Sequence, residues 1–203
     1  MVLDIGANIG HWSGRLSKMV GPQGKVIAFE PVPITYERFK KIYKNLKNIN
    51  IYDLALSDKD NFVEFLVPQH SFALTTSYIS STNPLINTNK IGFTSIKLPT
   101  YCLDSIYKEL DINFCSFIKC DVEGHELEVM QGAISFLSRF KPVIYIEILR
   151  EKWVEGDPRK SGVSSFLEKL GYSSFQIHEG AASEIFKPEI ENFLFLYKCK
   201  ITN

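Results

Sequence analysis

The first thirty residues contain two short apolar segments, and each leads into residues suited to ligand binding. Val2–Ile5 runs into a turn that contains Gly6 and Gly10, and Lys25–Glu30 ends in a carboxylate. This layout predicts a parallel α/β sheet that binds an adenosine-containing cofactor. The glycines would let backbone N–H groups approach the ligand, and the acid would accept the ribose hydroxyls. The simpler interpretation is a strand-to-helix turn that needs glycine only for its backbone conformation.

The spacing of the glycines narrows the class of cofactor. A dinucleotide fingerprint needs G-x-G-x-x-G, but the pattern here is Asp4-x-Gly6-x-x-x-Gly10, with Asn8 where the second glycine would be. A P-loop is excluded because no Gly-Lys-Ser/Thr follows the turn. The D-x-G-x-x-x-G form resembles motif I of class I S-adenosylmethionine-dependent methyltransferases. A nicotinamide-dependent oxidoreductase and a non-catalytic module that retains the fold stay open as alternatives.

Apolar segments alternate with amphipathic ones along the whole chain, which predicts a mostly parallel sheet covered on both faces. The last two apolar segments are joined by a proline-containing loop without a helix, so they should pair antiparallel. The predicted fold is α/β, a doubly wound sheet with a C-terminal antiparallel hairpin, as in class I methyltransferases. The expected strands are 2–5, 25–30, 49–55, 61–67, 95–99, 115–121, 142–148, 172–178 and 192–198, and the expected helices are 12–20, 35–46, 103–110, 126–140 and 162–170.

Two of these helices have a clear apolar period. The helix that begins near Thr35 should bury one face, made of Tyr36, Phe39, Ile42, Tyr43 and Leu46. The helix expected over 126–140 should be continuous and bury Leu127, Met130, Ala133, Ile134 and Leu137.

Length and pattern favour a single domain over residues 1–203. One stretch differs in character: residues 69–94 are rich in Ser, Thr and Asn and show no sustained period. A polar insertion of this length is a functional lid or substrate loop, or it is disordered, and the sequence leaves both open. We expect this segment to govern the acceptor.

Charge and cysteine usage exclude several functions. Lys plus Arg equals Asp plus Glu, 23 against 23, so no basic excess indicates a nucleic-acid partner. The four cysteines show neither a C-x-x-C pair nor zinc-like spacing with the histidines. There is no signal-peptide pattern and no apolar run near twenty residues. We therefore expect a cytoplasmic protein without a membrane span; nothing in the sequence specifies an oligomeric state.

A second motif, Lys119-Cys-Asp-Val-Glu-Gly-His-Glu126, follows the fourth expected strand of the parallel sheet. Together with Val2–Gly10, Phe29-Glu-Pro31, Ala55-Leu-Ser-Asp58, Leu103-Asp-Ser105 and Pro142-Val-Ile-Tyr-Ile-Glu147, it resembles the FkbM-type methyltransferase family. The resemblance covers most of residues 2–148. It implies methylation of oxygen on sugars, polysaccharides or polyketide-type natural products, hence S-adenosylmethionine as cofactor and a small-molecule or glycan acceptor.

The resemblance also implies roles for individual residues. Glu30 would hold the ribose, and Asp121 would lie beside the sulfonium. The methionyl end would be lined by Asp4, Gly6, Asn8 and Gly10, and the adenine would lie near Ser57 and Asp58.

Methyl transfer to a hydroxyl needs a base, and His125 is the leading candidate because neutral imidazole is the natural base near pH 7. Glu123 or Glu147 would orient it or bind the acceptor's hydroxyls. Other interpretations remain: His125 as an exposed helix-start residue, and Glu123 and Glu126 as helix caps. Asp121, His125 and Glu147 could also bind Mg²⁺ or Mn²⁺, although we favour a metal-free site.

Overall fold

The computed structural model describes residues 1–68, 78–79, 93–178, 181–183 and 191–198. Its main element is an eight-stranded sheet in the order β11-β10-β12-β9-β8-β1-β2-β3. The strands are β1 (Val2–Ile5), β2 (Val26–Phe29), β3 (Ile49–Tyr52), β8 (Phe117–Cys120), β9 (Val143–Glu147), β10 (Tyr172–His178), β11 (Ala181–Ser183) and β12 (Asn192–Tyr197).

The direction of the strands confirms the predicted fold class. Strands β3, β2, β1, β8 and β9 are parallel, and β12 pairs antiparallel with both β9 and β10. The chain runs from β1 outward to β3 and then returns to the other side of β1 at β8. The carboxyl ends of β1 and β8 therefore flank a topological switch point, where open α/β sheets bind ligands.

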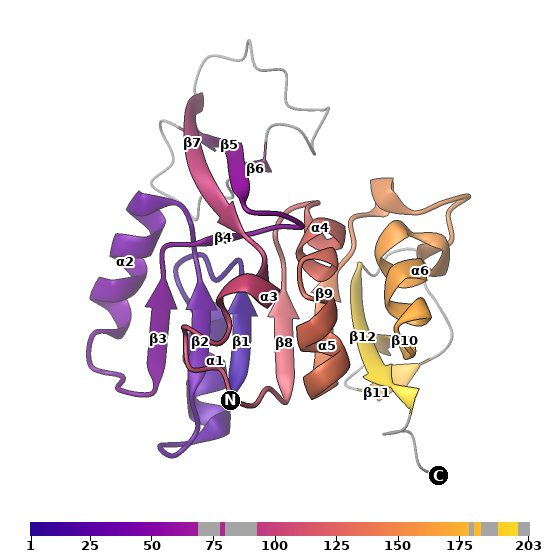
Figure 1. Cartoon of the computed structure of the whole chain (residues 1–203), viewed down its shortest axis with the longest axis horizontal. Helices are drawn as coiled ribbons and strands as arrows, with labels where there is room; N and C mark the ends of the chain where they lie inside the picture. Colours follow the sequence, from indigo (N-terminus) through magenta and orange to yellow (C-terminus); the bar gives the residue numbers. More distant parts are fainter. Residues whose placement is uncertain (69–77, 80–92, 179–180, 184–190, 199–203) are drawn as a thin grey trace.

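Helices cover the sheet on both faces (Figure 1). Ser13 of the first helix donates a hydrogen bond to Asp4 on one face, whereas Leu3 and Ile5 of the same strand join the core on the other. In the described residues no helix is long and apolar enough to cross a membrane. The helices are α1 (His11–Val20), α2 (Pro33–Tyr43), α3 (Leu103–Ile106), α4 (Glu126–Gln131), α5 (Ile134–Phe140) and α6 (Gly162–Lys169), with 3-10 turns at Arg150–Lys152 and Pro158–Lys160.

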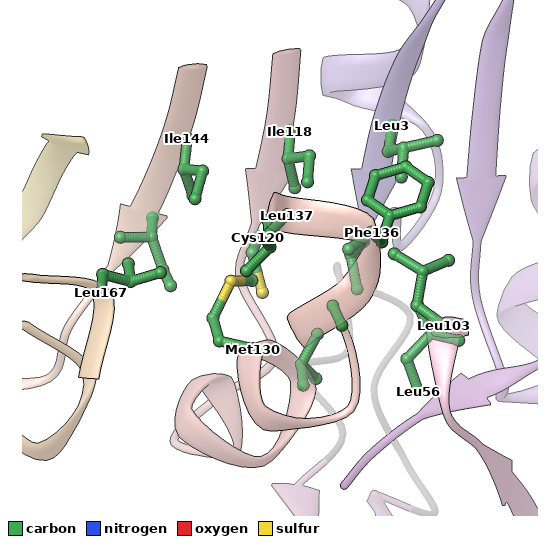
Figure 2. Packing of buried hydrophobic residues seen from close by; sticks show 14 of the residues in the cluster. Leu3, Leu56, Leu103, Ile118, Cys120, Met130, Phe136, Leu137, Ile144 and Leu167 are labelled. Carbon is green, nitrogen blue, oxygen red and sulfur yellow. The ribbon is translucent and has the colours of Figure 1, made fainter. Parts of the chain in front are cut away.

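The main core lies between the sheet and the helices that follow β8 (Figure 2). Leu3, Ile118 and Ile144 come from three adjacent strands and are fully buried. They pack against the layer formed by α4 and α5, which contributes Met130 and Phe136. This core fixes β1 and β8 side by side and so sets the positions of the residues that follow them.

A second, four-stranded sheet stands beyond the carboxyl ends of the parallel strands (Figure 1). The strand expected over 49–55 is too long. Strand β3 ends at Tyr52, and Ala55 and Leu56 belong to the second sheet, where they pair with Thr100 and Tyr101. The expected insertion 69–94 lies largely outside the described residues. The sheet has the order β4-β7-β5-β6, with β4 (Ala55–Leu56), β5 (Asn61–Pro68), β6 (Tyr78–Ile79) and β7 (Phe93–Tyr101).

The helix expected over 126–140 is two helices, because the chain breaks at Gly132. The carboxylate of Asp104 accepts hydrogen bonds from the backbone N–H groups of Ser135 and Phe136, both at 2.8 Å, and so caps the start of α5. Ile134, which we expected to be buried, is 45% exposed as a result of this new start.

The burial predicted for the second helix is also partly wrong. Helix α2 packs at the edge of the sheet beside β3 and buries only Thr35 and Phe39 fully. Ile42 and Leu46, which we expected on the buried face, are 56% and 38% exposed. A helix at the edge of a sheet contacts the sheet along only part of its surface. Some apolar residues of α2 therefore lie outside this contact and remain exposed.

Candidate functional site

A cavity of about 340 Å³ opens at the carboxyl ends of β1, β2 and β8. Its wall includes four short segments: Gly6–Asn8, Glu30–Val32, Leu54–Leu56 and Asp121–Glu123. This volume lies at the lower end of the range for small-molecule and cofactor sites. The cavity lies at the switch point that the order of the strands defines.

Gly6 is required by the packing of two strands. It has φ +73°, and a Cβ added there would lie 1.9 Å from the backbone oxygen of Asp121. Only a residue without a side chain therefore lets the turn after β1 approach the end of β8. Gly10, with φ +90°, lies against Phe39 of α2 and not on the cavity wall.

The backbone N–H groups of the turn have hydrogen-bond acceptors within the protein. The N–H groups of Gly6 and Ala7 both donate to the Phe29 carbonyl, and that of Gly10 donates to the Ala7 carbonyl. The Asn8 N–H donates to the Glu30 carboxylate at 2.9 Å. These N–H groups thus have acceptors within the protein, and their contact with a ligand stays a prediction.

Glu30 is the most buried acid on the wall, with 6% of its surface exposed. One carboxylate oxygen accepts the Asn8 N–H and the other accepts the Val32 N–H, each at 2.9 Å. Burial raises the pKa of Glu30 to about 7 despite these hydrogen bonds. Each carboxylate oxygen has a second lone pair, so Glu30 can still accept hydroxyl groups of a ligand.

Lys119 is a buried cation that joins the two motifs, and the sequence analysis assigned it no role. Its ammonium lies 3.1 Å from the Gly6 carbonyl oxygen, 3.3 Å from an Asp121 carboxylate oxygen and 3.6 Å from one of Asp4. Asp4 and Lys119 are neighbours in register on β1 and β8. Asp4 is fully buried beneath α1 and is not on the cavity wall. A lysine within the apolar run Phe117–Cys120 is the signal that could have identified this cluster.

Three acids gather at one end of the cavity. Asp121 and Glu123 lie on the wall, and Glu147 ends β9, the strand next to β8, where Ile146 is in register with Cys120. Burial and the charge of Asp121 raise the pKa of Glu123 to about 7. The same two causes raise the pKa of Glu147 to about 7. Glu123 has φ +56°, a left-handed conformation that is uncommon for a residue with a side chain.

His125 lies on the wall but is buried, so the interpretation as an exposed helix-start residue is wrong. Its Nε2 is 2.9 Å from the Ser57 hydroxyl, and its Nδ1 is 3.5 Å from a Glu128 carboxylate oxygen. Burial lowers the pKa of His125, which keeps the ring neutral at pH 7. Both ring nitrogens therefore face groups of the protein.

The other predicted residues near this histidine do not reach the cavity. Ser57 is buried, and neither Ser57 nor Asp58 is on the wall. Glu126 accepts the N–H groups of Val122 and Gly124, both at 3.0 Å, so it closes the loop before α4 and does not cap the helix as we expected. Within the described ranges, no three His, Cys, Asp or Glu side chains are placed to hold a metal ion.

The chemistry of the wall fits S-adenosylmethionine. Leu54–Leu56, Val32 and Phe65 form an apolar part beside Glu30, which suits an adenine ring next to a ribose. Asp121 and Glu123 lie at the other end, where acids suit the positive charge of the ammonium and sulfonium groups. The two kinds of surface thus occur in the order that the cofactor requires.

Comparisons with known proteins give the family and the fold of the chain. The family model described as the methyltransferase FkbM domain matches residues 4–174. The structure of an FkbM methyltransferase from Methylobacillus flagellatus is similar, with a TM-score of 0.56 and 17% identity over 97% of this chain and 43% of that protein. Fibrillarin from Aeropyrum pernix, solved with S-adenosyl-L-methionine, has a TM-score of 0.53 and 12% identity over 96% of this chain and 64% of its own.

These similarities cover nearly all of this chain but only part of each related protein. The chain spans less than half the length of the Methylobacillus protein. At identities of 17% and 12% the two likenesses support the class I methyltransferase fold, with its mostly parallel sheet and antiparallel closing strands. No curated protein matches the chain.

Proposed function

Because the chain belongs to the FkbM methyltransferase family, we propose that it methylates a hydroxyl oxygen of a sugar, polysaccharide or natural-product acceptor. The acceptor class rests on the resemblance carried by the sequence motifs. S-adenosylmethionine supplies an activated methyl group when it is bound, so the protein's part is to position two molecules and to remove one proton.

Polar groups at the two ends of the cavity would bind different parts of the cofactor. Glu30 would bind the ribose hydroxyls through the lone pairs that Asn8 and Val32 leave unused. Asp121, held by Lys119 at 3.3 Å, would face the positive end of the cofactor. Gly6 would contribute by letting the turn and Asp121 come this close together.

We assign the role of base to Glu123, and one observation carries this choice. Its carboxylate lies on the cavity wall beside Asp121, and burial raises its pKa to about 7. A base with a pKa near the working pH is partly ionised and still basic enough to accept a hydroxyl proton. The left-handed backbone at Glu123, φ +56°, fixes the direction in which this side chain leaves the loop.

His125, the first candidate from the sequence, takes a positioning role in this proposal. Its Nε2 lies 2.9 Å from Ser57, so it links the end of the Ala55–Ser57 segment to the start of α4. Accepting a proton from the acceptor would require this contact to break. The two candidates are therefore distinguishable by substitution.

Binding tests the cofactor first. Calorimetry with S-adenosylhomocysteine and with NADH should show binding of the former only. Binding of NADH without any response to S-adenosylhomocysteine would support the oxidoreductase instead. Binding of S-adenosylhomocysteine without transfer to any of a panel of monosaccharides, nucleotide sugars and oligosaccharides would support the non-catalytic module.

Transfer of a labelled methyl group to an acceptor from this panel then tests the base. Glu123→Gln should lower kcat about a hundred- to ten-thousandfold while S-adenosylhomocysteine still binds. In the parent, kcat should rise with pH through about 7, because the carboxylate must be ionised to act. His125→Gln should retain most of kcat. Parental turnover in Glu123→Gln together with loss of turnover in His125→Gln would reverse the assignment.

A further inference from the structure

Trp12 is an aromatic residue on the cavity wall to which the proposed function assigns no role. It lies in the first turn of α1 and is half-buried. Its ring packs against that of Tyr145, with 5.2 Å between the ring centroids and 47° between the planes. The exposed guanidinium of Arg15 lies 5.8 Å from the centroid of the Trp12 ring, a weak surface contact that a ligand can displace. The indole is therefore supported by Tyr145 and reaches the cavity.

The order of the strands places Trp12 at the acidic end of the cavity. Its partner Tyr145 lies on β9, and the neighbour of Tyr145 in register on β8 is Lys119. The Lys119 ammonium is 3.3 Å from Asp121, which follows β8 directly. Glu30 follows β2, on the far side of β1. With the ribose at Glu30 and the sulfonium beside Asp121, the space next to Trp12 is left for the acceptor.

An aromatic ring beside carboxylates suits a cyclic carbohydrate. One face of a pyranose ring carries C–H groups, which are apolar and slightly positive, so they pack on the negative face of an aromatic ring. The hydroxyl groups leave from the edge of the sugar and can donate charge-assisted hydrogen bonds to Asp121 and Glu123, which are on the same wall. An open-chain polyol has hydroxyl groups but no flat C–H face, and ordering it against an indole costs conformational entropy.

We infer that Trp12 is the residue by which the site selects a ring-shaped sugar acceptor over an open-chain one. This inference rests on the proposed function. The pyranose would lie with its C–H face on the indole and with one hydroxyl group directed toward Glu123. Tyr145 would be a positioning residue, because its contact with Trp12 holds the plane of the indole at a fixed angle.

The experiment measures methyl transfer to methyl hexopyranosides and methyl 6-deoxyhexopyranosides, and to the alditols made by reducing the same sugars. We expect the parent to have the higher kcat/KM with the pyranosides. Trp12→Ala should raise the KM for the pyranoside about ten- to a hundredfold, because the apolar contact is lost, while kcat changes less and S-adenosylhomocysteine binds as before. Trp12→Phe should restore most of the preference. Met19→Ala, which removes an exposed apolar side chain from the same helix, should behave like the parent.

A second measurement uses the parent alone, so it does not depend on the folding of any variant. With S-adenosylhomocysteine bound, saturation of the protein's aromatic protons should pass by NMR to the ring protons of the pyranosides and much less to the alditols.

Transfer of methyl to alditols as efficiently as to pyranosides would overturn the inference, and so would a chain that binds S-adenosylhomocysteine but methylates no pyranoside. An equal weakening of S-adenosylhomocysteine and of the pyranoside in Trp12→Ala would also overturn it, since that is the result of a structural role or of a cofactor contact. A folded chain that does not bind S-adenosylhomocysteine would instead refute the proposed function, from which the inference starts.

Discussion

Glu30 has two tasks that a sequence pattern would not separate. The proposed function has it bind the ribose, and the structure shows that it also accepts the N–H groups of Asn8 and Val32. The carboxylate therefore holds together the turn after β1 and the segment after β2. Any substitution here changes the protein itself as well as the ligand contact.

We expect Glu30→Ala to weaken S-adenosylhomocysteine binding roughly ten- to a hundredfold, because charge-assisted hydrogen bonds contribute about 1.5–3 kcal/mol. The variant should also lose about 2 kcal/mol of unfolding free energy, since two N–H groups lose their acceptor. Glu30→Gln should recover part of the stability but not the affinity. Calorimetry and urea unfolding measure the two effects, and exposed Glu109→Ala is the control. Unchanged affinity in Glu30→Ala would show that the acid does not contact the ribose.

Single residues at the site divide into those that motifs can locate and those that they cannot. Gly6, Glu30 and Asp121 lie on the cavity wall because each follows a strand directly, and strand ends are visible in a sequence. The link between Lys119 and Asp4 depends on the register of two strands that are far apart in the chain. The contact between Ser57 and His125 likewise crosses 68 positions. Such pairs arise from packing, and no local pattern specifies them.

At the scale of elements, the break between α4 and α5 is the clearest departure from local preference. A Cβ at Gly132 would lie 1.9 Å from the backbone oxygen of Ser57, so the glycine lets the segment after β4 pack against the helices. Periodicity correctly predicted the central strands of the large sheet and the positions of most helices, because burial imposes a repeat. It could not predict this break or the second sheet, since both depend on segments distant in sequence.

Gly132→Ala distinguishes a continuous helix from a broken one, because the two predict opposite changes in unfolding free energy. In a continuous helix, alanine would add about 1 kcal/mol of stability over glycine. In the structure the φ of Gly132, −75°, suits alanine, but the added Cβ collides with backbone. We therefore expect a loss of about 2 kcal/mol in unfolding free energy, measured by urea denaturation. Ser138→Ala, on the exposed face of α5, should be neutral or slightly stabilising. A gain in Gly132→Ala would contradict the broken helix.

At the scale of the whole molecule, three acids at the site have raised pKa values and make the stability of the fold depend on pH. Burial raises the pKa of Glu30 to about 7, and burial with neighbouring acids raises those of Glu123 and Glu147 to about 7. The folded state thus holds protons that the unfolded chain releases near pH 4.5. The stability that these groups contribute is complete below about 4.5 and is lost as the pH rises through 7. His125, whose pKa burial lowers, acts in the opposite direction.

We expect the unfolding free energy of the cofactor-free protein to fall by an amount on the order of 2 kcal/mol between pH 5 and 7.5. Much of the fall should come from Glu30, because Glu123 and Glu147 are partly exposed and solvent screens them. Urea unfolding across this range measures it, and Glu30→Gln should reduce the fall. A stability that rises over the same interval would show that these acids are not shifted upward.

The central place of β1 in the sheet has a consequence for folding during synthesis. One edge of β1 pairs with β2, which follows it closely, but the other edge waits for β8, with Val2 meeting Phe117, 115 positions later. At a synthesis rate of about 5–20 residues per second, that edge stays unpaired for roughly 6–23 s on each new chain. Its free N–H and C=O groups are then open to wrong partners. The ribosome's pace, and any chaperone that shields this edge, therefore bear on how many chains reach the native state.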